Sequence, residues 1–390
     1  MKIKIDRVKK LLDELSLIGK TEDDGVTRVA FSKEDLKARN MLISRFKALD
    51  MIVRQDPAGN IIASTSPGKG LVIGSHLDTV VNGGNLDGIL GVVAGLEVYE
   101  TLREHDIDFN MPFHIVIFAA EEGVRLNGTF GSRAIAGLIS DQEIYDLSGQ
   151  NYGIVDFENI HLCQRFKDEM KYLLEMHIEQ GRLLEKNKNK IGIVKDIFGI
   201  KRKTIHIYGQ ADHAGNTPMN IRNDAMVSAA RVICDLTNQA EILDDTVATF
   251  GYVNVKPNCV NVIPSEVELK LEVRSNNPEN FDKIDQALMN ILDNYKIQCL
   301  IKEDVYKKPK LLSKELQDVI EEVVIKSVPF QYISSGAGHD SASFAEKIPT
   351  AMIFVPSIDG VSHSPKEDTS MEDIEIGCQV LLDTVYRLIT

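Results

Sequence analysis

The sequence predicts an α/β protein built around a mostly parallel sheet, with a smaller ferredoxin-like α+β domain inserted into the first domain. Three observations carry this prediction. The chain has 390 residues, which exceeds the usual size of a single domain. Short apolar runs alternate with helical patterns in the first and last parts of the chain, as in parallel sheets covered by helices. The middle part alternates apolar and polar residues, which is typical of a sheet with one solvated face.

The first domain is expected to begin with two helices. Val8, Leu11, Leu12 and Leu15 recur at helical spacing, and a second helical pattern covers residues 33–49. Strands are then predicted at 71–75, 113–119, 172–176 and 350–355, and helices at 88–103, 131–139 and 371–389. This alternation indicates a largely parallel sheet with helices packed on it.

The inserted domain is predicted to cover residues 196–308, so that 1–195 and 309–390 form the discontinuous first domain. The lysine-rich stretch 185–195 and residues 307–312 are interpreted as the two crossings between the domains. The predicted elements are strands near 200–208, 246–255, 267–273 and 297–302, and helices at 222–239 and 279–294. Their order is β-α-β-β-α-β, the ferredoxin-like arrangement.

Charge and cysteine content narrow the class of protein. The 44 Lys and Arg against 58 Asp and Glu give a net charge of −14, which argues against binding along a nucleic-acid backbone. The five cysteines include no C-x-x-C pair, as expected for free thiols in a reducing compartment. The charged N-terminal stretch does not resemble a signal peptide, and no apolar run is long enough for a membrane span. We therefore expect a cytoplasmic protein that binds neither nucleic acid nor membrane.

Polar residues follow the predicted strands of the first domain. These segments contain His76 and Asp78, Asp87, Glu121 and Glu122, His177, and His363. Ligands bind outside the carboxyl ends of the strands in open parallel sheets, so these residues are expected to converge in one cleft.

The convergent residues have the composition of a site for two metal ions. Imidazole nitrogen and carboxylate oxygen suit Zn²⁺, Mn²⁺, Co²⁺ or Ni²⁺. Asp87 is the natural bridging carboxylate, and Asp78 could hold the second nitrogen of His76. Glu121 and Glu122 cannot share one role, so one is expected to bind an ion while the other acts as general base.

Taken singly, each of these motifs is ordinary. An isolated His-x-Asp is usually structural, and a Glu-Glu pair is usually solvated; only their joint order at strand ends makes the prediction specific. The four other histidines outside such contexts are interpreted as surface or packing residues: His105, His114, His161 and His206.

Seven ordered motifs that contain these residues resemble the M20 metallopeptidase and amidohydrolase superfamily. They are GSHLDTVVNGGNLDGILGVVAGLEVYETL, AAEEGVRLNGTFGSRAIAG, MHIEQGRLLE, ADHAGNTPM, NVIPSEVELKLEVRS, SSGAGHDS and GVSHSPKEDTS. The resemblance covers nearly the whole chain and is to the branch of N-carbamoyl-L-amino-acid hydrolases, β-ureidopropionases and allantoate amidohydrolases.

The resemblance implies a catalytic first domain, and an inserted domain that dimerises and acts as a lid. Two divalent ions per subunit would be held by His76 and His177 on one side and Glu122 and His363 on the other, with Asp87 as the bridge. Glu121 would be the base. A histidine at position 177 in place of Asp or Glu favours the ureido-hydrolase branch over a dipeptidase.

Further residues match the substrate positions of this branch. His213 resembles the histidine that reaches the partner subunit's site and stabilises the oxyanion, and Asn261 and Arg274 resemble the pair that holds the substrate carboxylate. The full set of implied substrate contacts is Gln180, His213, Asn261, Arg274, Gly336, Gly338 and His339. Arg274 ends an amphipathic strand, so it could instead simply face solvent.

The resemblance therefore implies hydrolysis of a small anionic ureido compound by a homodimer, with release of ammonia and CO₂. The loop from Thr79 to Asp87 looks most like that of allantoate amidohydrolases, and N-carbamoyl-L-amino acids and β-ureidopropionate remain alternative substrates. A metal-dependent dipeptidase or aminoacylase is an alternative from another class. A non-catalytic regulator on the same fold is disfavoured by the intact Glu121 and the five intact ligands.

Overall fold

The computed structural model describes residues 1–150 and 152–390. The chain forms two compact units. The first unit consists of Met1–Lys195 and Leu311–Thr390, and the second of Asp196–Lys310.

The described residues of the first unit form one sheet of nine strands, with the order β1-β2-β4-β3-β5-β13-β6-β11 and β12 paired to β6. The four central strands β4 (Phe113–Phe118), β3 (Gly70–His76), β5 (Met170–Ile178) and β13 (Thr350–Val355) run parallel to one another. The outer pairs β1–β2, β2–β4 and β13–β6 are antiparallel. The predicted mostly parallel sheet is thus confirmed for its centre.

Helices cover both faces of this sheet, which explains why its central strands are mostly apolar. Leu71 and Ile73 of β3 belong to one core, with α1 (Ile5–Ser16), α2 (Lys33–Ala48), α3 (Ile89–Glu104), α10 (Lys314–Val324) and α11 (Met371–Ile389). Val72 belongs to the core on the other face, which includes residues of α4 (Phe130–Ala136) and α6 (Gln164–Lys167). Successive residues of one strand point to opposite faces, so a single strand serves both cores.

Several shorter elements of the first unit were not expected from the sequence. The strands are β1 (Ile52–Gln55), β2 (Ile61–Ser64), β6 (Ile191–Ile197), β11 (Lys310–Leu311) and β12 (Phe330–Ser335). The helices are α5 (Asp141–Ser148) and α7 (Leu183–Asn187), with the 3₁₀ turns η1 (Phe157–Cys163), η3 (Asp340–Ser343) and η4 (Ile358–Gly360). The stretch interpreted as a crossing, 185–195, therefore contains part of a helix and most of a sheet strand.

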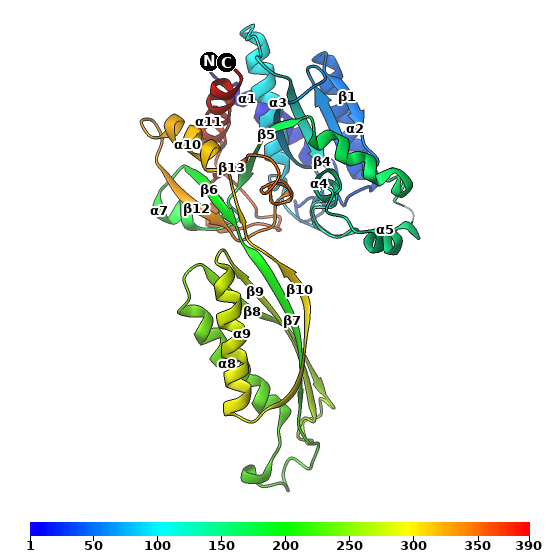
Figure 1. Cartoon of the computed structure of the whole chain (residues 1–390), viewed down its shortest axis with the longest axis vertical. Coiled ribbons are helices and arrows are strands. Elements are labelled where there is room, and N and C mark those ends of the chain that lie inside the picture. The colour runs from blue at the N-terminus through cyan, green and yellow to red at the C-terminus, as the bar shows by residue number, and fades with distance from the viewer. Residues whose placement is uncertain (151) are drawn as a thin grey trace. The chain divides into compact units, whose positions relative to one another are not determined.

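The two ends of the chain lie side by side in the first unit (Figure 1). The backbone N–H of Ile3 donates to Oε1 of Gln379 in α11 at 3.2 Å, and Nε2 of Gln379 donates to the carbonyl of Met1 at 3.2 Å. None of the helices in the described residues has the length and apolarity needed to cross a membrane.

The second unit has the predicted order of strands and helices. It runs β7 (Gly199–Tyr208), α8 (Ala225–Glu241), β8 (Thr246–Lys256), β9 (Glu266–Ser275), α9 (Pro278–Asn294) and β10 (Gln298–Lys307), with the turn η2 (Met219–Ile221) before α8. The sheet is antiparallel with the order β10-β7-β9-β8. The two helices lie side by side (Figure 1). Alternate residues of β7 and β9, such as Ile205 and Leu269, are buried in the same core as α8 and α9.

Candidate metal centre

The carboxyl ends of the central parallel strands carry the candidate site. His76 is the last residue of β3, and His177 is the next-to-last residue of β5. Asp87 lies in the loop that leads into α3, two residues before the helix begins. Gly88 has a φ of 74°, and a Cβ at this position would lie 2.3 Å from Nε2 of His76. The loop therefore needs glycine here to bring Asp87 against the histidine ring.

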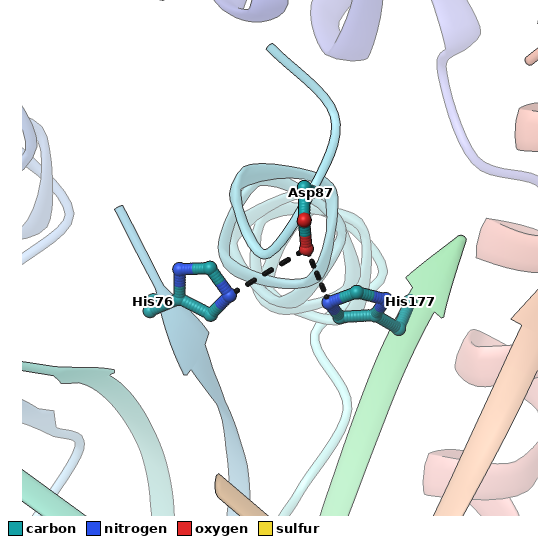
Figure 2. Close-up of side chains that lie close together, drawn as sticks. All are labelled: His76, Asp87 and His177. Atoms are coloured by element: carbon teal, nitrogen blue, oxygen red, sulfur yellow. Dashed lines mark ion pairs between the residues drawn. The ribbon is translucent and has the colours of Figure 1, made fainter. Parts of the chain in front are cut away.

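One group of three side chains consists of His76, Asp87 and His177 (Figure 2). Nε2 of His177 lies 2.9 Å from Oδ1 of Asp87, and Nε2 of His76 lies 3.7 Å from the same oxygen. All three residues are buried. Two imidazole nitrogens thus face one buried carboxylate oxygen.

The opposite nitrogens of both rings are held by backbone carbonyls. Nδ1 of His76 donates to the carbonyl of Asp78 at 3.0 Å, and Nδ1 of His177 donates to the carbonyl of Ile178 at 2.8 Å. Because a carbonyl can only accept, Nδ1 carries a proton in each ring and the neutral ring presents its Nε2 lone pair to Asp87. This is the tautomer that a histidine needs to bind a metal through Nε2.

The second group consists of Asp87, Glu122 and His363. Nε2 of His363 lies 3.0 Å from Oδ2 of Asp87 and 3.4 Å from Oε2 of Glu122. Each oxygen of the Asp87 carboxylate therefore faces one group. This is the arrangement expected of a carboxylate that bridges two ions.

The electrostatics of the two groups favour a cation. Among the described residues, the ion-pair partners of Asp87, Glu121 and Glu122 are all histidines. Burial raises the pKa of Glu122 to about 7, helped by the Asp87 carboxylate. The donors are imidazole nitrogens and carboxylate oxygens, and they fit divalent ions such as Zn²⁺ or Mn²⁺.

The Asp87 carboxylate raises the pKa values of two of the histidines. Burial alone would lower the pKa of His177, but the hydrogen bond with Asp87 raises it to about 9. The hydrogen bond with the same carboxylate raises the pKa of His363 to about 9. Despite its burial, Asp87 is held ionised by the two histidines, which keep the pKa of its carboxyl well below the ordinary range.

Glu121 lies beside the first group, with Oε2 at 3.9 Å from Nε2 of His76. Burial raises the pKa of Glu121 well above its ordinary value, and the neighbouring carboxylates of Asp340 and Glu122 add to the rise. Glu121 belongs to neither of the two three-residue groups. A basic carboxylate next to the candidate ions is in a position to accept a proton.

The carboxylate of Asp78 has a different role from the predicted contact with the His76 ring. It lies 3.9 Å from Nδ1 of that ring, which instead donates to the Asp78 backbone carbonyl. Oδ1 accepts the backbone N–H of Glu121 at 3.2 Å, and Oδ2 accepts that of Glu122 at 3.1 Å. Asp78 therefore orients the Glu121–Glu122 segment, while its backbone orients His76.

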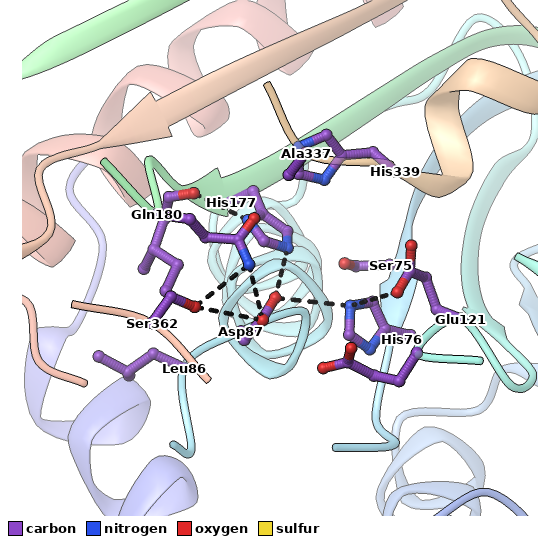
Figure 3. A network of polar contacts seen from close by, with 12 residues as sticks. Ser75, His76, Leu86, Asp87, Glu121, His177, Gln180, Ala337, His339 and Ser362 are labelled. Carbon is purple, nitrogen blue, oxygen red and sulfur yellow. Dashed lines mark hydrogen bonds and ion pairs between the residues drawn. The ribbon is translucent and has the colours of Figure 1, made fainter. Parts of the chain in front are cut away.

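Gln180 contacts the Asp87 carboxylate directly (Figure 3). Its Nε2 donates to Oδ2 of Asp87 at 2.8 Å and to Oγ of Ser362 at 3.2 Å. Its φ of 56° lies in the left-handed region, which turns the chain sharply after β5. The buried Oε1 of Gln180 has no partner among the described residues, so it is a polar atom at the site with unused acceptor capacity.

His339 packs against the first group. Its ring centroid lies 4.6 Å from that of His177 at 72°, and Nε2 of His339 lies 2.7 Å from Oγ of Ser335. Burial lowers the pKa of His339 well below its ordinary value. Gly336 and Gly338 lie in the exposed loop before it, and a Cβ at either position would meet nothing within 4 Å.

The other predicted substrate residues lie in the second unit. His213 is exposed, and its Nδ1 accepts the backbone N–H of Gly215 at 3.1 Å and of Asn216 at 3.0 Å. The proton of the neutral ring is therefore on Nε2, which leaves His213 as a hydrogen-bond donor.

Asn261 is adjacent to the His213 segment, because its carbonyl accepts the N–H of Ala214 at 3.1 Å. Arg274 lies on β9, where its Nε donates to Oε1 of Glu272 at 2.7 Å. The structure thus brings His213 and Asn261 to one loop cluster.

Two residues of the site were not singled out from the sequence. Ser362 donates to Glu367 at 3.0 Å and lies 3.4 Å from Oδ2 of Asp87, and Glu367 is buried beneath the loops that carry Asp87 and His363. The sequence offered only the position of Glu367 in the last motif, four residues after His363, as a signal.

Comparison with known proteins places the chain in a family. Residues 72–387 match the model of peptidase family M20/M25/M40. The chain is 35% identical to the N-carbamoyl-L-amino acid amidohydrolase of Geobacillus stearothermophilus over 98% of each chain. It is 33% identical to the allantoate amidohydrolase of Escherichia coli K12, over 98% of this chain and 97% of that one.

A solved structure gives the same result for the fold. The chain resembles an amidase of the hydantoinase/carbamoylase family from Burkholderia multivorans, with a TM-score of 0.89, 32% identity, and coverage of 98% and 97% of the two chains. The strand-end residues and the match over 72–387 agree with the resemblance seen in the motifs, and the chain belongs to peptidase family M20/M25/M40.

Proposed function

We propose that this protein is a metal-dependent amidohydrolase that cleaves a linear ureido (N-carbamoyl) amide bond and releases ammonia and CO₂. Allantoate or an N-carbamoyl-L-amino acid is the proposed substrate. The proposal rests on one observation above all: the Asp87 carboxylate lies between two groups of candidate ligands, with Glu121 beside them. The identity of 33–35% to amidohydrolases of these two kinds supports the substrate class.

The five proposed ligands would hold two divalent ions, Zn²⁺ or alternatively Mn²⁺, Co²⁺ or Ni²⁺. His76 and His177 would bind one ion, Glu122 and His363 the other, and Asp87 both. Ions bound there would supply Lewis acidity, which lowers the pKa of a water and polarises a carbonyl. The hydrogen bonds from Nδ1 of His76 and His177 to backbone carbonyls support this assignment, because they direct Nε2 toward Asp87.

Glu121 is the proposed general base. It accepts a proton from the attacking water, whose oxygen forms a bond to the carbamoyl carbon. Glu121 then donates that proton to the leaving nitrogen as the carbon–nitrogen bond breaks. The products are the amine and carbamate, which decomposes to ammonia and CO₂.

His213 is proposed to donate a hydrogen bond to the oxyanion in the site of a second copy of the chain. Its Nδ1 is occupied by two backbone N–H groups, so Nε2–H is the donor available to a ligand. Asn261 and Arg274 are proposed to bind the substrate carboxylate, since a guanidinium suits a carboxylate. The second unit would then serve as lid and dimerisation domain of an obligate homodimer.

A substrate panel tests this proposal. Ammonia release is measured with Mn²⁺-loaded protein on allantoate, several N-carbamoyl-L-amino acids and β-ureidopropionate. Amino-acid release from dipeptides and N-acetyl amino acids is measured in parallel. Turnover of a ureido compound that is lost in Glu121→Gln supports the proposal. Turnover confined to dipeptides or N-acetyl amino acids would assign the site to the peptidase or aminoacylase class instead.

A further inference from the structure

We propose that Glu367 is a positioning residue that joins the loops carrying Asp87 and His363, and so sets the affinity of the Asp87–Glu122–His363 group for its ion. This inference rests on the dinuclear centre proposed above. Glu367 would touch neither the reacting atoms nor an ion, and it would act through the two ligands.

The Glu367 carboxylate accepts four hydrogen bonds from two separate loops. Oε1 accepts the backbone N–H of Leu86 at 2.9 Å and that of Asp87 at 3.0 Å. Oε2 accepts the hydroxyl of Ser362 at 3.0 Å and the backbone N–H of His363 at 3.3 Å. The side chain therefore bonds to the backbone of both ligands, which are far apart in the sequence.

The surroundings leave this carboxylate little freedom. Glu367 is 8% exposed. A Cβ at Gly84 would lie 2.1 Å from Oε1 of Glu367 and 2.5 Å from its Cβ. The loop before Asp87 therefore packs its backbone directly on the glutamate, which only glycine permits.

The other ligands have supports of their own. His76 and His177 lie on β3 and β5, and their Nδ1 atoms donate to backbone carbonyls. The backbone N–H of Glu122 donates to Asp78.

His363 lies in a loop rather than on a strand. Its own φ is 55° and its side chain is 51% exposed, so it has less support than the other ligands. Removal of Glu367 should therefore weaken the group containing His363 more than the group containing both strand histidines.

A glutamine at this position makes a conservative test. Its single acceptor oxygen can serve one pair of donors, and its NH₂ then faces the other pair. Ser362 can rotate its hydroxyl to accept from that NH₂, but the backbone N–H of His363 loses its partner. Glu367→Gln should therefore retain the loop at Asp87 and loosen the one at His363.

The experiment titrates chelator-treated wild-type and variant chains with Mn²⁺ and follows the heat of binding and the bound ions per chain. For Glu367→Gln we expect a first ion bound as in the wild type and a second ion bound about 10–100-fold more weakly, the range for loss of a partner that orients a ligand. Gly84→Ala places a Cβ against Oε1, the oxygen that holds the Asp87 loop, and should weaken both ions because Asp87 belongs to both groups. In a His363→Ala background, Glu367→Gln should have no further effect on ion binding.

Glu97→Gln is the matched control. Glu97 is 3% exposed and accepts the backbone N–H of Lys4 at 2.6 Å, so it also joins two segments, but it contacts no proposed ligand. It should lower thermal stability and leave both ions bound.

Unchanged binding of two ions by Glu367→Gln and Gly84→Ala would overturn the proposal, as would equal weakening of both ions by Glu367→Gln or a further loss in the His363→Ala background. A wild-type chain that binds fewer than two ions would overturn the dinuclear centre and this inference together, and that result is distinct from a defect confined to the variants.

Discussion

Nε2 of His177 lies 2.9 Å from Oδ1 of Asp87, while Nδ1 of the same ring donates to the backbone carbonyl of Ile178. Two lone pairs therefore face each other when the ring is neutral, and only a proton or a cation between them makes this contact favourable. The same holds for His363, whose Nε2 lies 3.0 Å from the other oxygen of Asp87. Each oxygen of the Asp87 carboxylate is thus poised to share a cation with a histidine.

Asp87→Asn should abolish the binding of at least one of the two ions. The substitution removes the charge between the two groups and places an amide N–H₂ against one histidine. Elemental analysis of metal-loaded, desalted protein measures the effect. Asp50→Asn is the control, because Asp50 is an exposed residue paired with Arg103. Two tightly bound ions per chain in Asp87→Asn would contradict the bridging role.

Glu121→Gln should lower kcat by about 10²–10⁴-fold, the usual contribution of a general base. Metal content and substrate binding should persist, because Glu121 belongs to neither ligand group. Steady-state kinetics and metal analysis on the same preparation check both points. Turnover close to that of the wild type would rule out Glu121 as the base.

Asp78→Asn should reduce kcat by roughly 10–100-fold even when both ion sites are saturated with Mn²⁺. The asparagine has one acceptor oxygen, so one of the N–H groups of Glu121 and Glu122 loses its partner. The base and its neighbouring ligand then lose their fixed orientation. Steady-state kinetics and metal analysis on the same Mn²⁺-saturated preparation separate a loss of kcat from a loss of metal. An unchanged kcat would show that the two hydrogen bonds have no part in positioning Glu121.

Metal binding should release protons at pH 7 and become tighter as the pH rises toward 9. The pKa values of His177 and His363 are both about 9 without an ion, so both rings are protonated at pH 7, whereas a ligand must be neutral. Calorimetric titration in buffers of different ionisation enthalpy counts the released protons. His363→Ala should release fewer. Affinity that stays flat between pH 7 and pH 9 would contradict this prediction.

Subunit exchange tests the role of His213. Inactive His213→Ala mixed with inactive Glu121→Gln should regain partial activity, because a mixed dimer contains one site with both residues intact. Each variant alone, carried through the same exchange, is the control. If no activity returns although mass measurements show mixed dimers, His213 does not act in the partner's site.

The central sheet and the side chains that converge at its edge could be predicted from the sequence, and the reason is physical. Buried parallel strands are apolar runs, and the polar residues that follow them must share one edge of the sheet. All five predicted ligands fall in the two groups around Asp87.

The outer strands were harder to predict. Strand β1 contains Arg54 and Gln55 and is mostly exposed, so its pattern is weak. Strand β6 is apolar and buried, but it begins within the lysine-rich stretch interpreted as a crossing.

The supporting hydrogen bonds could not be predicted from residue types. The sequence places Asp78 two residues after His76, but only the loop geometry decides that its carboxylate bonds to Glu121 and Glu122 rather than to the ring. Glu367 likewise depends on the meeting of two loops that no local pattern connects.

Metal-dependent hydrolysis of a ureido compound is tested most directly by titrating chelator-treated protein with Mn²⁺ and measuring ammonia release from allantoate and N-carbamoyl-L-amino acids at each point. We expect no activity without metal, and activity that rises until two ions are bound per chain. Full activity in the metal-free protein, or no ammonia from any of these ureido compounds with two ions bound, would contradict this expectation.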